Sequence, residues 1–183
     1  LFATLKKMIR SLKFIVANTV LPYWHMVLEQ VAYLKDQHHF CELLDDILLS
    51  LGHLKITETD PIWNRYILIA EKLKEMGAAP LRDRLFANIA CMFAEKGFLE
   101  KAREVISYIA DEKLCSAPLS EFGIQWIRKK SELGVALDVL PEIALVQDQL
   151  RVLAFIVNHI PPGDSGRSLW KRITISLQTL HWH

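Results

Sequence analysis

The chain has 183 residues, of which 51% are apolar, and it holds only seven glycines and seven prolines. Few glycines together with many apolar residues exclude a disordered or collagen-like chain and disfavour a turn-rich all-β protein. The 22 basic and 21 acidic residues leave a net charge of +1. Nucleic-acid binding usually needs a clustered excess of basic residues, so we expect no nucleic acid among the partners.

Apolar residues recur at helical spacing along almost the whole chain, as at Ile62, Tyr66, Ile69, Leu73 and Met76. The pattern predicts an all-α protein of about ten helices, because no sustained alternation typical of strands accompanies it. Short connections favour antiparallel helical hairpins. In chain order, the expected helices span residues 3–20, 23–35, 37–51, 61–76, 80–96, 98–110, 118–131, 133–145, 148–160 and 168–181.

Turn-forming residues agree with several of these boundaries. Asp60 is a good N-cap for a helix with Pro61 at its first position, where the missing N–H costs nothing. Pro118 is expected to start a helix in the same way. Gly77 and Gly97 follow apolar stripes, as residues that end helices do.

The first expected helix is amphipathic and basic. Residues 1–28 carry no acidic residue, and their four cations are Lys6, Lys7, Arg10 and Lys13. The uncharged stretch 14–28 is too short and too polar for a membrane span. Residues 1–20 therefore either cap the helical array with a solvated basic face, which we prefer, or make peripheral contact with an anionic membrane or an acidic partner.

Two patterns repeat along the chain. Residues 102–109 read A-x2-V-I-x2-I, and residues 136–143, which lie 34 positions later, read A-x2-V-L-x2-I. Residues 84–89 read R-x2-A-x-I and recur 67 positions later, at 151–156. A small residue lets a partner helix approach closely, so this pattern predicts stacked helical hairpins. We expect the repeat alanines to be buried at helix contacts: Ala87, Ala102, Ala136 and Ala154.

The segment LFANIACMFAEKGFLEKA, residues 85–102, resembles the helix–turn–helix unit of degenerate bacterial tetratricopeptide-like repeat proteins. The resemblance extends over roughly residues 62–160. It implies a short α-solenoid that serves as a binding scaffold. The middle unit departs from the pattern with Ser120, Gly123 and Gln125. Pro141, which lies inside an expected helix, predicts a kink or a fresh start.

We expect one continuous domain, in which the helices of residues 1–60, including the basic first helix, pack on a repeat array of residues 61–183. The three cysteines are widely spaced and odd in number. This usage favours reduced thiols and a cytoplasmic location.

Two motifs invite a chemical interpretation. Residues 163–166 read GDSG, as in a serine-protease nucleophile loop, but Arg167 follows and no strands are expected. A loop that leads to Ser168 as a helix N-cap explains them better. His38, Glu42 and Asp45 share a helix face and raise the alternative of a metal or enzyme site. A solvated polar face opposite the apolar stripe explains the same residues and is the preferred interpretation, so we assign no catalytic, cofactor-binding or metal-binding residue.

The leading hypothesis is a non-enzymatic scaffold that binds a protein or peptide. Alternatives are a regulatory or sensor domain of a larger chain, or a metal-binding or enzymatic helical protein. In repeat arrays the first helix of each hairpin builds the binding surface, and its polar positions here lean toward basic residues, which suits an acidic peptide. The candidate partner-binding residues are Arg84, Asn88, Trp126, Lys130, Arg151 and Asn158.

Overall fold

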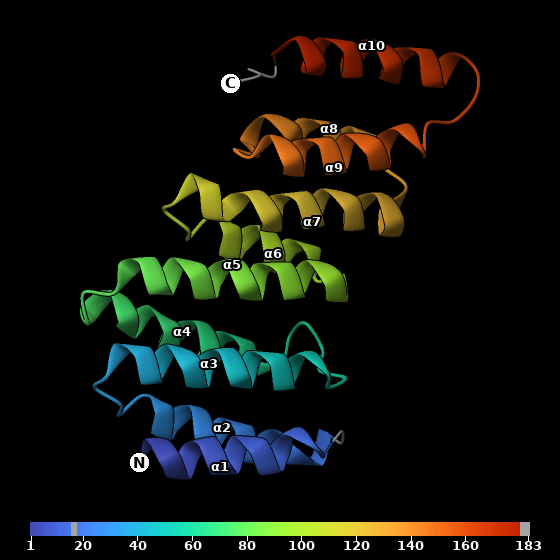
Figure 1. Ribbon diagram of the computed structural model, residues 1–183. Coiled ribbons are helices and arrows are strands. Elements are labelled where there is room, and N and C mark those ends of the chain that lie inside the picture. Colours follow the sequence, from blue (N-terminus) through green and yellow to red (C-terminus); the bar gives the residue numbers. More distant parts are fainter. Residues whose placement is uncertain (16–17, 180–183) are drawn as a thin grey trace. The chain divides into compact units, whose positions relative to one another are not determined.

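The computed structural model describes residues 1–15 and 18–179. Within these residues the protein is all-α, with no strand, as the sequence predicts. The described chain forms ten α-helices and two short 3-10 helices (Figure 1). Their bounds are α1 Phe2–Lys13, η1 Asn18–Val20, α2 Leu21–Val31, α3 Gln37–Gly52, α4 Pro61–Glu75, α5 Ala79–Lys96, α6 Leu99–Ile106, α7 Glu112–Lys130, α8 Leu133–Val139, η2 Leu140–Glu142, α9 Val146–Val157 and α10 Asp164–Thr179.

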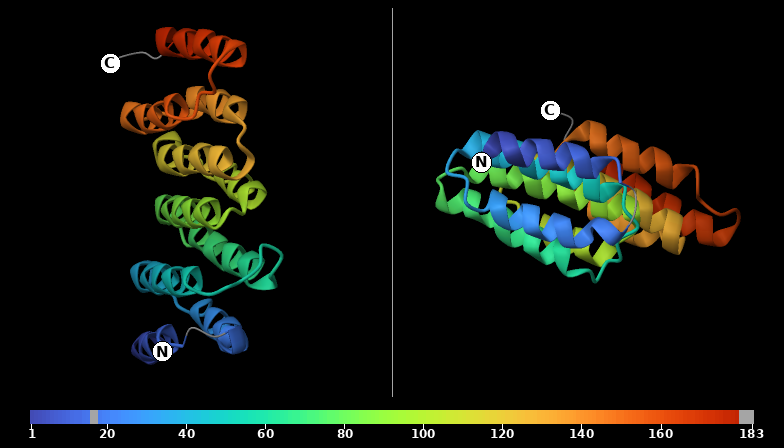
Figure 2. Two further views of the ribbon diagram at one scale, coloured as in Figure 1. Left: turned by 90° about the vertical axis from the view of Figure 1, so that its right-hand side faces the viewer. Right: turned by 90° about the horizontal axis from the view of Figure 1, so that it is seen from below.

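The chain divides into two compact units, Leu1–Phe86 and Ala87–His183, so that α5 contributes to both. In the first unit, α1 packs on α2 and α3, and α2 packs on α3 and α4. In the second unit, α7 packs on α6, α8 and α9, and α8 also packs on α10. Inside each unit, helices therefore contact both the next helix and the next but one (Figure 2).

Ion pairs also link helices that are next but one along the chain. Six of them join a helix to the next helix but one, or to the 3-10 turn that continues it, and their partners lie 30 to 39 residues apart. This separation is close to the 34-residue period of the sequence. Mostly exposed pairs stabilise a fold by only about 0–1 kcal/mol each, so they fix the register of the helices more than they stabilise them. The six are Lys6–Glu42, Glu29–Arg65, Asp45–Arg84, Arg103–Glu142, Glu121–Arg151 and Asp138–Arg172.

Large aromatic side chains fill the first unit. Trp24, Trp63 and Tyr66 are almost fully buried. The Tyr66 hydroxyl donates to the Leu44 carbonyl at 3.2 Å, which ties α4 to α3 through a polar group inside the core. Burial raises the pKa of the Tyr66 phenol well above its usual range, so the hydroxyl stays a neutral donor.

Several expected helix boundaries are confirmed. The Asp60 carboxylate accepts from the Ile62 amide at 3.0 Å, with Pro61 as the first residue of α4. Gly77 and Gly97 adopt φ values of 76° and 82° directly after α4 and α5. An L-residue with a side chain rarely takes these values, which explains why glycine ends both helices.

Helix α7 begins six residues earlier than the sequence predicts, so the expectation that Pro118 starts it is wrong. Asp111 caps the helix instead, since its carboxylate accepts from the Lys113 amide at 2.9 Å. Pro118 then lies inside the helix and is buried. The helix therefore continues through Pro118, whose missing N–H removes one backbone hydrogen bond.

Other helix ends also differ from expectation. Helix α1 ends at Lys13, well before residue 20, and residues 16–17 lie outside the described chain. Helix α8 stops at Val139, and Pro141 lies in the 3-10 helix that follows, which confirms the predicted break. Helix α10 begins at Asp164, so Ser168 lies inside it and is not its cap.

The repeat alanines behave differently from one another. Ala87, Ala102 and Ala136 are buried, as expected, but Ala154 is exposed, which corrects the sequence-based expectation. Helix α9 buries the face that carries Val152, Leu153 and Ile156. Ala154 points to the opposite side of α9, because it lies about 150° around the helix from the middle of that face.

Candidate functional site

Helix α7 carries an unusual row of buried polar residues, because it is covered by three other helices of the second unit. Ser116, Ser120, Glu121 and Gln125 are all buried. The Ser116 hydroxyl accepts from the Leu145 amide at 3.0 Å, on the segment that leads into α9. Buried polar groups usually have such partners, and within this row Ser116 and Glu121 form hydrogen bonds that join α7 to its neighbours.

The centre of this row is the carboxylate of Glu121, whose side chain is 9% exposed. Arg151 of α9 donates to Glu121 Oε2 at 2.6 Å, and Gln125 donates to Glu121 Oε1 at 2.8 Å. The Arg151 side chain itself is 53% exposed. A buried carboxylate therefore binds one terminal nitrogen of the Arg151 guanidinium, and more than half of the Arg151 side chain is exposed.

A second guanidinium lies on the same two helices. Arg128 of α7 lies over the ring of Phe155, with 5.1 Å between the guanidinium carbon and the ring centroid. The ring of His159 stacks on Phe155 from one turn further along α9, at 4.3 Å. Cation–π contact orients a guanidinium without using its hydrogen-bond donors. We call the surface formed by Glu121, Gln125, Arg128, Arg151 and Phe155 the α7–α9 face.

Cys91 of α5 borders this face. Burial raises the pKa of its thiol to about 12, with further contributions from the charges of Glu95 and Glu121, and Arg151 acts in the opposite direction. Such a thiol stays protonated at neutral pH and is a poor nucleophile. The charges of Glu121 on α7 and Arg151 on α9 therefore reach the Cys91 thiol on α5.

One of the candidate residues taken from the sequence belongs to this surface, and two others lie near it in the chain. Arg151 is its central cation, Asn158 caps the C-terminal end of α9, and Asn88 is one turn from Cys91 on α5. Asn88, Arg151 and Asn158 are all exposed.

The other three candidates lie elsewhere. Trp126 is about 140° around α7 from Glu121; its ring lies against Phe122 at 5.3 Å, and its Nε1 donates to Glu132 at 3.0 Å. Lys130, the last residue of α7, is about 180° from Glu121. Arg84 belongs to the first unit, where it donates to Asp45 at 3.2 Å and to the Cys41 sulfur at 3.0 Å.

Sequence analysis did not identify Glu121, Gln125, Arg128 and Phe155 as members of the site. A signal for them exists, because Glu121, Gln125 and Arg128 are spaced four and three residues apart, as on one helix face.

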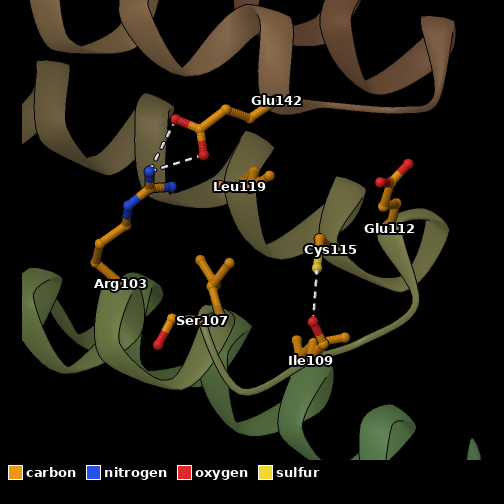
Figure 3. A pocket seen from close by; sticks show the side chains of 8 residues that line it. Arg103, Ser107, Ile109, Glu112, Cys115, Leu119 and Glu142 are labelled. Atoms are coloured by element: carbon orange, nitrogen blue, oxygen red, sulfur yellow. Dashed lines mark hydrogen bonds and ion pairs between the residues drawn. The ribbon is translucent and has the colours of Figure 1, made fainter.

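A separate pocket of about 270 Å³ opens between α6, α7 and η2 (Figure 3). Arg103 spans one side and makes two hydrogen bonds to the Glu142 carboxylate, at 2.7 and 2.8 Å. The Cys115 sulfur faces the Ile109 carbonyl at 4.0 Å. Arg103 and Glu142 satisfy each other, and the other polar side chains that line the pocket are Ser107, Glu112 and Cys115.

The residues considered for a metal site have other partners. Glu42 pairs with Lys6, Asp45 pairs with Arg84, and His38 is exposed. Among the described residues, no three His, Cys, Asp or Glu side chains come together as metal ligands would. The GDSG motif has its backbone at the start of α10, but the side chains of Asp164 and Ser165 lie outside what the structure describes.

None of the described helices combines the length and the apolar character that crossing a membrane requires. All three cysteines are free thiols. Comparison with protein families, with curated proteins and with solved structures finds no match to this chain.

Proposed function

We propose that this chain is a non-enzymatic scaffold of the tetratricopeptide-like type, a short α-solenoid that binds a protein or peptide on the α7–α9 face. The observation that carries the proposal is the contact between Arg151 and the buried Glu121. A long side chain usually loses much conformational entropy when it binds a partner. Glu121 has already removed part of that cost, because it holds Arg151 in place before any partner arrives.

The packing within each unit supports the repeat interpretation. Helices contact the next but one, and ion pairs link them at about the period of the sequence repeat. Stacked hairpins place the first helix of every pair on one side. In the second unit, Arg151 of α9 donates to Glu121 of α7, and the charges of both reach Cys91 of α5, which supports such an arrangement.

The chemistry of the face favours a ligand that carries a carboxylate. The contact with the Phe155 ring uses none of the N–H donors of Arg128. Arg151 has further N–H donors besides the one that binds Glu121. A guanidinium binds a carboxylate through two parallel hydrogen bonds, which gives direction as well as energy. A peptide with an Asp or Glu side chain that reaches both arginines is therefore the proposed partner.

The test is selection of displayed random peptides on the purified chain. We expect enriched peptides to contain acidic residues, and we expect Arg128→Ala and Arg151→Ala each to weaken them about tenfold. Arg172→Ala is the matched control, because Arg172 is an exposed arginine of the same unit that pairs with Asp138 at 2.7 Å. Equal enrichment on the double variant Arg128→Ala/Arg151→Ala would contradict the proposal.

A further inference from the structure

Helix α1 carries more cations than take part in its ion pairs within the described chain. Lys6 pairs with Glu42 of α3. Lys7, Arg10 and Lys13 are exposed and form no ion pair within the described chain. Two acids, Glu42 and Asp46, line a hollow of about 280 Å³ beside Lys6, Arg10 and Lys13. When the charges of Glu42 and Asp46 are subtracted from those of the four α1 cations, a net charge of +2 remains.

A second surface of α1 is apolar although it faces solvent. A hollow of about 280 Å³ runs along the seam between α1 and α2, and Met8, Leu12 and Tyr23 give it an apolar floor. Its polar members are Thr4, Ser11 and Lys7. Lys7 therefore joins the basic face of α1 to this apolar seam.

Large apolar side chains at or near α1 and α2 are also exposed. Phe14, directly after α1, is 84% exposed, and Tyr23 and Tyr33 of the α2 region are 55% and 72% exposed. Glu29, the acidic residue of α2, is held by Arg65 at 2.7 Å. Six of the fourteen large apolar side chains that are exposed in the described chain fall within its first 33 residues: Leu1, Phe14, Ile15, Tyr23, Met26 and Tyr33.

We propose that α1 and the outer side of α2 dock on an anionic lipid surface. The cations complement lipid phosphates and carboxylates, and the apolar side chains enter the boundary between headgroups and acyl chains. An acidic protein partner would satisfy the cations equally well. The protruding Phe14 and the two exposed tyrosines favour the membrane, because a bilayer accepts projecting side chains without a matching cavity and Tyr is enriched at its interface.

This inference is independent of the proposed peptide-binding function, because the surface belongs to the first unit and shares no residue with the α7–α9 face. The two proposals can therefore fail separately. The experiment is sedimentation of the full chain with vesicles of phosphatidylcholine alone, and with vesicles that contain about 30% phosphatidylserine.

We expect binding to the anionic vesicles only, and weaker binding when salt rises from about 0.1 to about 0.5 M, which shortens the screening length. Removing one cation near such a surface weakens binding about fivefold, so Lys7→Glu/Lys13→Glu should lose at least about 25-fold. Phe14→Ser should also weaken binding while preserving its salt dependence.

The control is Lys113→Glu/Lys171→Glu, which makes the same charge change at two exposed lysines of the second unit. It should bind as the unchanged chain does. Circular dichroism checks that each variant folds, and all four lysines are exposed or at a helix surface. Loss of binding equal to that of Lys7→Glu/Lys13→Glu would show a non-specific charge effect and overturn the proposal.

Two other results would also overturn it. One is equal sedimentation with neutral and anionic vesicles. The other is self-association that Phe14→Ser abolishes, measured by analytical ultracentrifugation, without any binding to vesicles; that outcome would assign the seam to a second copy of the chain.

Discussion

Arg151 and Glu121 form the same kind of contact in the second unit that Arg84 and Asp45 form in the first. In each case the arginine that opens the R-x2-A-x-I pattern donates to an acid on the helix two places earlier, at 2.6 Å and 3.2 Å. The acids differ in burial, since Glu121 is nearly enclosed and Asp45 is 31% exposed. The repeated arginine is thus a register contact between stacked helices as well as a candidate binding residue.

Removal of Arg151 should destabilise the second unit. Arg151→Ala leaves the buried Glu121 carboxylate with Gln125 as its remaining side-chain donor, and we expect a loss of about 1–3 kcal/mol in the free energy of unfolding. Arg172→Ala removes a pair whose partner, Asp138, is 71% exposed, and should cost less than about 1 kcal/mol. Urea unfolding of both variants measures the two losses in the free energy of unfolding. Equal losses would show that the burial of Glu121 does not strengthen its pair.

Gly123 is expected to accept alanine but no larger residue. A Cβ atom at this position would lie 3.6 Å from a Val152 methyl group and 3.7 Å from the Ala136 Cβ, both ordinary contacts. Gly123→Ala should therefore stabilise the protein by about 0.5–1 kcal/mol through helix propensity. Gly123→Leu should cost about 1–3 kcal/mol by overpacking.

Thermal melts of both Gly123 variants test this, with Gly97→Ala as a control of opposite sign. Gly97 has a φ of 82°, so alanine there should destabilise the protein despite its higher helix propensity. If Gly123→Ala lowers the melting temperature as Gly97→Ala does, the contact between α7 and α8 is closer than the structure shows.

Two alanines that belong to the two repeat patterns should respond differently to enlargement. Ala102 is fully buried, so Ala102→Leu should overpack α6 and cost about 1–3 kcal/mol. Ala154 is exposed, so Ala154→Leu should change stability by less than about 0.5 kcal/mol. Chemical denaturation of the two variants measures both changes in stability. A large loss for Ala154→Leu would mean that another surface covers this side of α9.

The thiol of Cys91 should make stability fall at high pH. Its pKa is raised in the folded chain to about 12 from an ordinary value of 9.0. Between these values the unfolded chain has released the proton and the folded chain has kept it, so the free energy of unfolding falls as pH rises. The loss should be at most about 1.4 kcal/mol per pH unit.

Cys91→Ala removes this contribution. We expect its stability to decline less steeply than that of the unchanged chain between pH 9 and pH 11 in urea unfolding, although lysines and tyrosines titrate in both proteins. Iodoacetamide should also modify Cys91 slowly at pH 8 in the folded chain. Rapid modification at that pH would be inconsistent with a buried thiol.

The sequence by itself determined the all-α class, most helix positions and several helix ends. These features depend on local interactions, such as the Asp60 carboxylate on the next amides and the positive φ that only glycine adopts easily at positions 77 and 97. Two helix starts that sequence analysis placed wrongly, at Pro118 and Ser168, are those where the helix begins several residues earlier in the chain.

Only the tertiary structure decided which side chains share a surface. The sequence alone does not indicate which acid pairs with Arg151. Its partner Glu121 lies 30 residues away and contacts it only because α7 and α9 pack side by side. The same packing turns Ala154 outward while Ala87, its counterpart in the repeat, is buried. Helical periodicity defines the faces of one helix, but the neighbours that cover each face are set by contacts between residues far apart in the chain.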